Sequence, residues 1–259
     1  LKVHRILLDF FESFYLGLVG LFFNLFLPSA VGGDVVKIYY AAKHSPGKKI
    51  QATTSIIMDR LMGFVALAIL TMTAFIFYSR QNHDMQINQV VYLFLGGIVL
   101  MVFFFLSPKS ADFFIFFGRV LPLKFREKLA ILVDTLYEFK LHPGAMSLAV
   151  LISIATQSLF IVVYFWLTLS LRVDIPISTF FIIIPILTVI SMAPSLGGLG
   201  VREAGVIYLF SKYMAHERAL ALSLLLDMLI YGFSLLSGII YSVRGGLKST
   251  EVLSSGDTQ

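Results

Sequence analysis

The sequence predicts an all-α integral membrane protein, a polytopic helical bundle with two inverted repeats that each contain a broken or re-entrant helix unit. Hydrophobic residues make up 58% of the 259-residue chain and charged residues 14%, against roughly 45–50% and about 25% in soluble domains. The apolar runs are long and continuous, unlike the alternating strands of a membrane barrel. A Pro-Ser/Gly-Gly pattern occurs twice. We therefore expect residues 1–259 to form a single membrane domain.

The first half of the chain contains one broken unit and two spans. An apolar stretch from Phe10 to Leu27 stops at Pro28, and a short helix is expected from about Gly33 to Ala42. The runs Thr53 to Tyr78 and Gln89 to Leu106 each approach the roughly 20 residues that a bilayer requires.

Residues 110–140 differ from the spans in their pattern. Apolar residues recur there at helical spacing, and charged residues hold mostly the other side. This pattern predicts an amphipathic helix in the cytoplasmic membrane interface, with a cytosolic helical hairpin as the alternative. The polar residues 248–259 are expected to form a flexible tail.

The second half repeats the arrangement. Ala145 to Leu169 is a predicted span, Pro176 to Ala193 and Val201 to Tyr213 flank the second break, and Arg218 to Val243 is the last span. The chain opens at Leu1 rather than Met, and we expect the numbering to start within a longer protein.

The two broken units share a sequence pattern. The first reads PSAVGGDVVK from Pro28 to Lys37, and the second reads PSLGGLGVRE from Pro194 to Glu203. A Ser-x-x-x-Asp pattern follows each, at Ser55 to Asp59 and at Ser223 to Asp227. Paired apolar segments interrupted by Gly and Pro indicate the central site of a transporter. We expect the two loops to meet near the membrane midplane, related by a pseudo-two-fold axis in the membrane plane.

The cations support this topology. Three full spans separate the broken units, so the units enter from opposite faces. Thirteen cations then lie on one face: Lys2, Arg5, Lys43, Lys48, Lys49, Lys109, Arg119, Lys124, Arg126, Lys128, Lys140, Arg244 and Lys248. Four lie on the other: Arg80, Arg172, Lys212 and Arg218. The positive-inside rule makes the first face cytoplasmic.

Seven charged residues remain at apparent membrane depth: Lys37, Arg60, Arg202, Asp34, Asp59, Glu203 and Asp227. A charge at the bilayer centre costs at least about 2.5–3.5 kcal/mol, so these groups must pair or face water. We expect Lys37 to pair with Asp59 and Arg202 to pair with Asp227. Arg60 is expected to extend to the cytoplasmic interface.

The glycine loops indicate an anion site. Gly32, Gly33, Gly197 and Gly198 allow tight turns, after which a helix begins with free N–H groups and a positive dipole end. With the nearby Lys37 or Arg202, each helix start could bind a phosphate. Ser29 and Ser195 could cap these helices or donate to the ligand, and Asp34 could be an N-cap or a site residue. A purely structural hinge is the alternative interpretation.

No catalytic or cofactor motif is visible. The chain has no cysteine, its five histidines lack metal-ligand spacing, and no Walker loop, G-x-S-x-G or H-E-x-x-H occurs. Gly198-Leu199-Gly200 lacks the third glycine of a dinucleotide site. We therefore expect no metal and no cofactor. The net charge of +5 reflects loop cations beside the spans, which argues against a nucleic-acid partner.

The run from Phe23 to Asp34, the pair Asp59-Arg60 and the run from Pro194 to Glu203 resemble the lysylphosphatidylglycerol synthase transmembrane, or flippase-like, family. The resemblance covers nearly the whole chain. It implies a role like that of the membrane domain in the multiple peptide resistance factor, which translocates aminoacylated phosphatidylglycerol between leaflets. Other members are associated with archaeal dolichol-linked glycosylation and hopanoid lipids. The resemblance also implies about two further N-terminal helices. Synthase activity is not implied, because the soluble aminoacyl-transferase domain has no counterpart here.

We therefore expect a lipid flippase or lipid-handling transporter in a bacterial or archaeal plasma membrane, with a cytoplasmic C-terminus. Its cargo would be an anionic or aminoacylated phospholipid, or a polyprenyl-phosphate-linked lipid. Lys37 and Arg202 would hold the phosphate. Asp59 and Asp227 would balance these cations, read a cationic headgroup or take up protons.

Two other classes stay open, although an enzyme is less favoured than a transporter. One is a membrane enzyme or subunit of lipid-linked glycan or lipid synthesis, with Asp34, Asp59 or Glu203 as general base. The other is a scaffold for a separate synthase. The expected partners are a membrane lipid with a phosphate headgroup and a separate lipid synthase or glycosyltransferase, and an oligomer stays open.

The charge bias generates a topology prediction. Lys48 and the tail near Ser254 should be cytoplasmic, whereas Gln81 and Asp174 should face outward. Single cysteines can be introduced at these four positions without background labelling, because the chain has no cysteine of its own. Membrane-impermeant maleimide should label Gln81→Cys from outside and Lys48→Cys only after permeabilisation. Labelling of both from the same side would contradict the inverted topology.

Overall fold

A computed structural model describes residues 10–27, 32–44, 48–79, 85–106, 135, 141–193, 195 and 199–243. Within these residues the secondary structure is helical, without strands, so the predicted all-α class is confirmed. The helices are α1 Phe10–Asn24, α2 Gly32–His44, α3 Lys49–Ser79, α4 Met85–Leu106, α7 Pro143–Ser170, α8 Ile177–Ile190, α9 Val201–Phe210 and α10 His216–Val243. They match the predicted elements in order and differ from them only at their ends.

Three of these helices are long and apolar enough to cross a membrane: Lys49–Phe77 within α3, Pro143–Ser170 and His216–Val243. Shorter apolar stretches occur at Phe11–Asn24, Asn88–Phe103 and Ile177–Ile190. Helices cross bilayers because they satisfy their own backbone hydrogen bonds. The described chain is therefore that of a multi-pass membrane protein.

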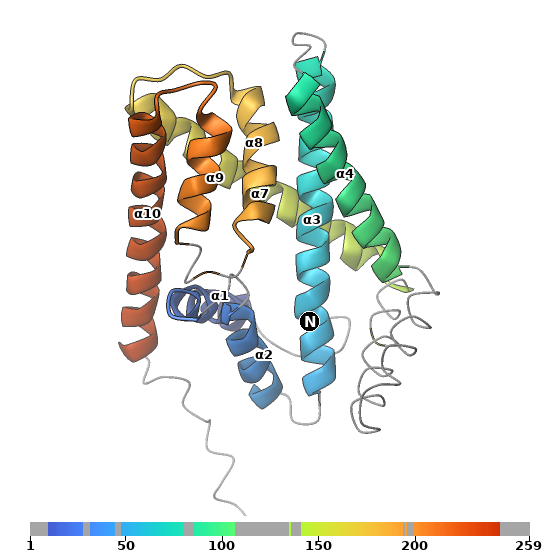
Figure 1. Cartoon of the computed structure of the whole chain (residues 1–259). Helices are drawn as coiled ribbons and strands as arrows, with labels where there is room; N and C mark the ends of the chain where they lie inside the picture. Colours follow the sequence, from blue (N-terminus) through green and yellow to red (C-terminus); the bar gives the residue numbers. More distant parts are fainter. Residues whose placement is uncertain are drawn as a thin grey trace, which may run out of the picture.

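The long and short helices have different places in the bundle (Figure 1). In that view α3 and α10 run the height of the molecule, and α7 crosses diagonally behind α8 and α9. Helices α8 and α9 lie side by side in the upper half, where α8 descends and α9 ascends. Helix α1 is seen end-on in the lower half, and α2 descends away from it. Both short units thus have an end at mid-height.

The main core lies between α7, α8, α9 and α10. Its fully buried members include Tyr164, Phe180, Phe210 and Leu226. The ring of Phe180 contacts that of Phe210, with centroids 5.5 Å apart. Burying such side chains stabilises the fold by about 1.5–3 kcal/mol each in water-referenced terms, and their close packing fixes the α8–α9 hairpin against the spans.

Glycines bring α1 and α2 into close contact. A Cβ on Gly33 would overlap the backbone carbonyl of Gly20. The N–H of Gly33 donates to Oδ1 of Asn24, at 3.3 Å. Because the first N–H groups of a helix lack intrahelical partners, Asn24 caps α2 from the end of α1. The predicted capping role of Asp34 is wrong, since Asp34 is the third residue of α2.

The α8–α9 unit is shaped by different residues. Gly200 precedes α9 with φ of +82°, a conformation that favours glycine. Among the residues that the structure describes, no side chain caps α9 by a hydrogen bond. The Ser195 hydroxyl donates instead to the carbonyl of Ala193, at 3.2 Å, so the expected capping of α9 by Ser195 is wrong.

Several predictions fall outside the described residues. These are Pro28, Ser29, Pro194, Gly197 and Gly198, the tail 248–259, and the interfacial segment 110–140 apart from Thr135. The inverted relation of the two halves stays a prediction. It agrees with α2 and α9 leading away from mid-height in opposite directions (Figure 1).

The α1–α2 contact generates a stability prediction. Gly33→Ala should lower the melting temperature in detergent, because the new methyl group meets the Gly20 carbonyl rather than a flexible side chain. We expect a loss of about 1–3 kcal/mol, typical of overpacking. Gly17→Ala, on α1 with open space around the glycine, is the matched control and should melt as the parent does. Equal melting of the two variants would contradict the prediction.

Candidate functional site

A cavity of about 550 Å³ lies where both short units meet the spans. Its charged lining residues are Asp34, Lys37, Asp59, Arg60 and Arg202. Its uncharged polar ones are Asn24, Ser153, Thr156, Gln157, Tyr164, Thr188 and Ser191. The first turns of α2 and α9 thus line one cavity, together with residues of α1, α3, α7 and α8. Pockets of roughly 300–1,000 Å³ hold small ligands or parts of larger ones.

Asp34 is the hub of the first unit. Its carboxylate accepts a hydrogen bond from Nε of Arg60 on α3, and Nζ of Lys37 lies 3.3 Å from its Oδ1. Asp34 itself is buried. The predicted Lys37–Asp59 pair is therefore wrong, because Asp34 takes Lys37 within the same helix.

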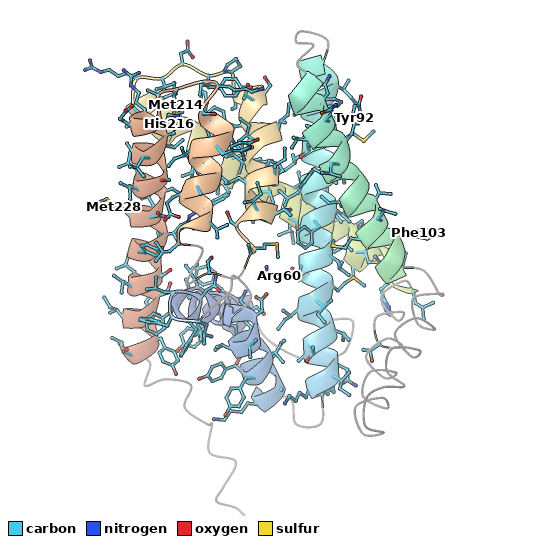
Figure 2. The ribbon with its side chains drawn as sticks, in the orientation of Figure 1. Arg60, Tyr92, Phe103, Met214, His216 and Met228 are labelled. Atoms are coloured by element: carbon cyan, nitrogen blue, oxygen red, sulfur yellow. The ribbon has the colours of Figure 1, made fainter. Side chains whose placement is uncertain are left out.

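Arg60 also differs from its prediction. It lines the cavity and pairs with Asp34 rather than extending to the interface. Figure 2 labels it in the centre of the molecule, between α2 and the lower ends of α8 and α9. The buried carboxylate of Asp34 therefore pairs with two cations, Lys37 from α2 and Arg60 from α3.

Asp59 lies outside the ion pairs formed by Asp34, Lys37 and Arg60. It lines the same cavity and is exposed to it. Among the described residues, it forms no ion pair. A carboxylate in this position is available to a cationic group of a ligand.

Lys37 reaches the cavity across a glycine. A Cβ on Gly20 would overlap the Lys37 stem, which lies against α1 at that point. Side-chain exposure of Lys37 is 33%, against 10% for its partner Asp34. The ammonium is therefore the more accessible member of the pair.

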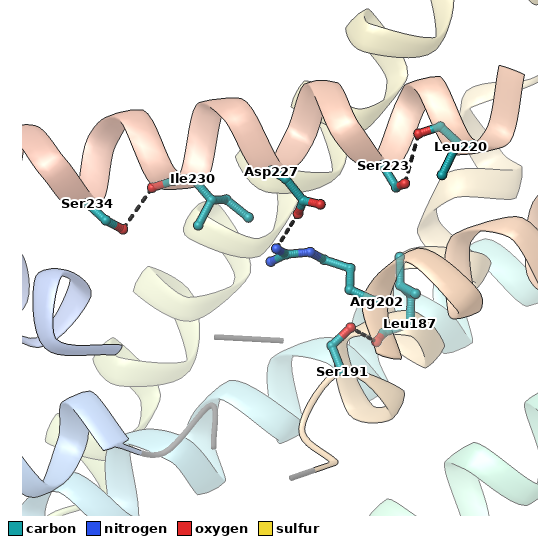
Figure 3. A network of polar contacts seen from close by, with 8 residues as sticks. All are labelled: Leu187, Ser191, Arg202, Leu220, Ser223, Asp227, Ile230 and Ser234. Carbon is teal, nitrogen blue, oxygen red and sulfur yellow. Dashed lines mark hydrogen bonds and ion pairs between the residues drawn. The ribbon is translucent and has the colours of Figure 1, made fainter. Parts of the chain in front are cut away.

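The second unit contains the predicted Arg202–Asp227 pair, which is confirmed. Figure 3 shows Asp227 of α10 reaching Arg202 in the first turn of α9, and the guanidinium donates to the carboxylate. Both residues are buried, at 8% and 4% exposure. The neighbouring Met228 points out of the bundle at 71% exposure (Figure 2), whereas Asp227 faces inward.

The other predicted site residues that the structure describes do not line the cavity. Oε2 of Glu203 is buried without a hydrogen-bond partner among the described residues, and Glu203 does not line the cavity. The Ser223 hydroxyl donates to the carbonyl of Leu220, at 2.9 Å. Gly32 and Gly33 are buried at the start of α2, where they serve helix packing.

The two units show opposite charge arrangements. In the first, the short helix carries the acid Asp34 and the span carries Arg60. In the second, the short helix carries Arg202 and the span carries Asp227. The paired residues are separated by 26 and 25 positions along the chain. Each short helix is thus joined to the following span by one ion pair, which is part-buried in the first unit and buried in the second.

The polar residues of α7 were not predicted. Ser153, Thr156 and Gln157 line the cavity, and Phe160 and Tyr164 continue the same face. Their spacing of three and four residues is that of one helix face, which the sequence displays within an apolar span. This stripe of polar side chains was the signal that could have identified them.

The lining can accommodate charges of both signs. Lys37 and Arg202 could approach an anion, and Asp59 could approach a cation. Helix N-termini beside the two cations add partial positive charge. Because Arg60 also binds Asp34, Lys37 can turn to a ligand without leaving that buried acid uncompensated.

The family model described as the lysylphosphatidylglycerol synthase TM region matches residues 1–238. No curated protein and no solved structure matches the chain. The match covers nearly the whole chain, including every residue of the cavity. The chain belongs to the lysylphosphatidylglycerol synthase transmembrane family.

Proposed function

We propose that this protein moves a phosphate-bearing lipid between membrane leaflets, with the headgroup in the central cavity and the apolar tails in the bilayer. Membership of the family gives a role connected with membrane lipids. The observation that carries the proposal is the shared cavity, into which both short units bring a cation from their first two turns. Its volume of about 550 Å³ suits a headgroup rather than a whole lipid.

Lys37 and Arg202 are the proposed phosphate contacts. Charge-assisted hydrogen bonds to phosphate are about twice as strong as neutral ones, and a low-dielectric cavity strengthens them further. Asp59 supports a headgroup that also carries an amine, because its carboxylate forms no ion pair among the described residues. An aminoacylated or other amine-bearing phospholipid therefore fits better than a polyprenyl phosphate, which would leave Asp59 without a partner.

The charge bias of the loops supports a plasma-membrane protein with a cytoplasmic C-terminal end. The loop from α2 to α3 would lie on that same face. In this orientation α2 leads from the cavity toward the cytoplasm, and α9 leads toward the outer face.

Reconstitution tests the function directly. The purified protein is placed in liposomes with fluorescent phosphatidylglycerol, phosphatidylethanolamine or aminoacylated phosphatidylglycerol, and leaflet exchange is followed with an impermeant quencher. Lipids are extracted afterwards and analysed by mass spectrometry. Faster exchange without a new lipid species is expected. A new species would instead support an enzyme, and neither result would support a scaffold.

Lys37→Gln should reduce transport by about tenfold or more, the loss expected for one charge-assisted contact. Its stability should change little, because Arg60 continues to compensate Asp34. Lys37→Arg should retain more activity, since a single charge rather than fork geometry is needed. Exchange rate and melting temperature are measured for each variant. Lys43→Gln, which removes an exposed cation from the same helix outside the cavity, is the control.

Gly20→Ala tests the role of Lys37 in a second way. The added methyl group displaces the Lys37 side chain from its position, while the charge of Lys37 is retained. Since the displaced atoms belong to a flexible side chain, the fold should tolerate the change. Transport by Gly20→Ala should fall, while Gly17→Ala should remain active. Full activity of both Lys37→Gln and Gly20→Ala would rule out a role for Lys37 in the site.

Arg202→Gln should behave differently from Lys37→Gln. It leaves Asp227 buried without its cation, which costs about 3–5 kcal/mol, so the protein should lose stability as well as transport. The double variant Arg202→Gln with Asp227→Asn should recover much of the stability, because position 227 no longer carries a buried charge without its cation. It should still fail to transport. Transport at the parental rate by the double variant would show that the pair is only structural.

A further inference from the structure

The polar face of α7 is the part of the central cavity wall to which the proposed transport assigns no contact. Ser153, Gln157, Phe160 and Tyr164 line the cavity there. They are spaced by three or four residues and therefore form one stripe along the helix. From Ser153 to Tyr164 this stripe extends about 16 Å along the helix axis. It is long enough to lie beside a whole lipid headgroup.

The two ends of the α7 stripe lie near charges of opposite sign. At the end that comes first in the chain, Val150 of α7 packs against the cluster that contains Met58, the residue before Asp59. At the other end, Tyr164 interacts electrostatically with Arg202. A headgroup with its phosphate at the arginine and an amine at the aspartate would therefore lie along α7, with its uncharged part beside the middle of the stripe.

Several uncharged polar groups of the cavity wall already form hydrogen bonds within the protein. The hydroxyls of Thr156, Thr188 and Ser191 donate to backbone carbonyls of their own helices. The side-chain oxygen of Asn24 accepts from the N–H of Gly33. Because a hydroxyl has a single proton, the three hydroxyls cannot donate to a ligand while these bonds are formed.

Gln157 and Tyr164 differ from these groups. Within the part of the chain that the structure describes, neither side chain forms a hydrogen bond. Tyr164 is 1% exposed, so the small accessible part of it faces the cavity that it lines, and the ring of Phe160 packs edge to face against it with centroids 5.3 Å apart. The amide of Gln157 provides two donor hydrogens and one acceptor oxygen. Polar groups inside a membrane bundle need partners, and a ligand in the cavity would supply them.

We propose that Gln157 and Tyr164 determine which headgroups the cavity accepts, by forming hydrogen bonds to hydroxyl or ester oxygens beside the phosphate. Gln157 is the main determinant, because it can donate to and accept from one hydroxylated group, whereas Tyr164 provides a single hydroxyl near Arg202. A headgroup without such oxygens would leave both side chains unpaired once it had displaced water from the cavity, and this selects against it. The inference rests on the proposed headgroup site and adds its selectivity for uncharged oxygens.

Two short-chain lipids of equal charge and similar size test this proposal. They are dioctanoyl phosphatidylglycerol and dioctanoyl phosphatidylpropanol, which lacks the two headgroup hydroxyls. Each is titrated into the purified full chain in detergent, and the apparent dissociation constant is obtained from the rise in melting temperature. The protein should bind phosphatidylglycerol about tenfold more tightly, as expected for one or two additional hydrogen bonds between neutral groups.

Gln157→Met keeps the length of the side chain and removes the amide, so this variant should bind both lipids with the affinity that the parent has for phosphatidylpropanol. Tyr164→Phe should retain a preference of about threefold. Gln89→Met is the matched control, because Gln89 is an exposed glutamine of α4 that does not line the cavity, and it should keep the full preference. Without lipid, Gln157→Met should melt no lower than the parent, since the change removes no hydrogen bond within the protein. Lower melting with an unchanged preference would identify a structural role and overturn the proposal.

The same titrations separate this inference from the proposed function. Lys37→Gln should weaken the binding of both lipids equally and keep the preference, because it removes a phosphate contact only. Equal affinity of the parent for the two lipids would leave the headgroup site in place and overturn the role of Gln157 and Tyr164. This comparison uses the unchanged chain, so it decides the question even if Gln157→Met does not fold. Absence of stabilisation by either lipid would refute the headgroup site itself, and the selectivity with it.

Discussion

The structure depends on two ion pairs that compensate charges at membrane depth. Helices α2 and α9, of 13 and 10 residues, are too short to be held in place as spans. Each is joined to the following long helix by one ion pair, Asp34 to Arg60 and Arg202 to Asp227. An unpaired charge in this environment costs several kcal/mol, so each pair fixes the height of its short helix. The helix starts therefore stay at the cavity that their residues line.

The same pairs explain why the cavity has a polar wall at all. Hydrocarbon tails are as apolar as leucine, so burying apolar side chains between helices hardly favours one helix arrangement over another in a membrane. Hydrogen bonds and ion pairs between polar side chains discriminate more strongly between arrangements. Asn24 satisfies the start of α2, Asp34 holds two cations, and the polar side chains of α7 face the same space. Packing of glycines and of the α7–α10 core then completes the fold.

The helix order, the membrane class and the Arg202–Asp227 pair were predictable from sequence. Apolar runs of membrane length have few alternatives, and the second unit offers one cation at the start of α9 and one acid in the interior of α10. The first unit offers more choices. Asp34 stands near a helix start, where aspartate is common as a cap, so its role as acceptor for Arg60 was not predicted. Nor could the sequence show which of the adjacent residues Asp59 and Arg60 faces Asp34, because the rotation of α3 about its axis is set by the neighbouring helices.

Tertiary packing also decided details that lie outside any local pattern. The Asn24 cap needs the end of α1 to reach the start of α2 across a turn, a relation that helical periodicity does not encode. Lys37 approaches the cavity only because Gly20, on another helix, leaves room for its stem. The α7 stripe is different, since its spacing was present in the sequence and was simply overshadowed by the surrounding apolar residues.

The opposite charge arrangement of the two ion pairs has a consequence for the history and engineering of such chains. Two copies of the first half, joined into one protein, would place an Asp34-type acid on both short helices and an Arg60-type cation on both spans. Two copies of the second half would place an Arg202-type cation on both short helices and an Asp227-type acid on both spans. The halves are complementary parts rather than interchangeable ones. A duplicated gene would acquire this cavity only after its two copies had diverged in charge.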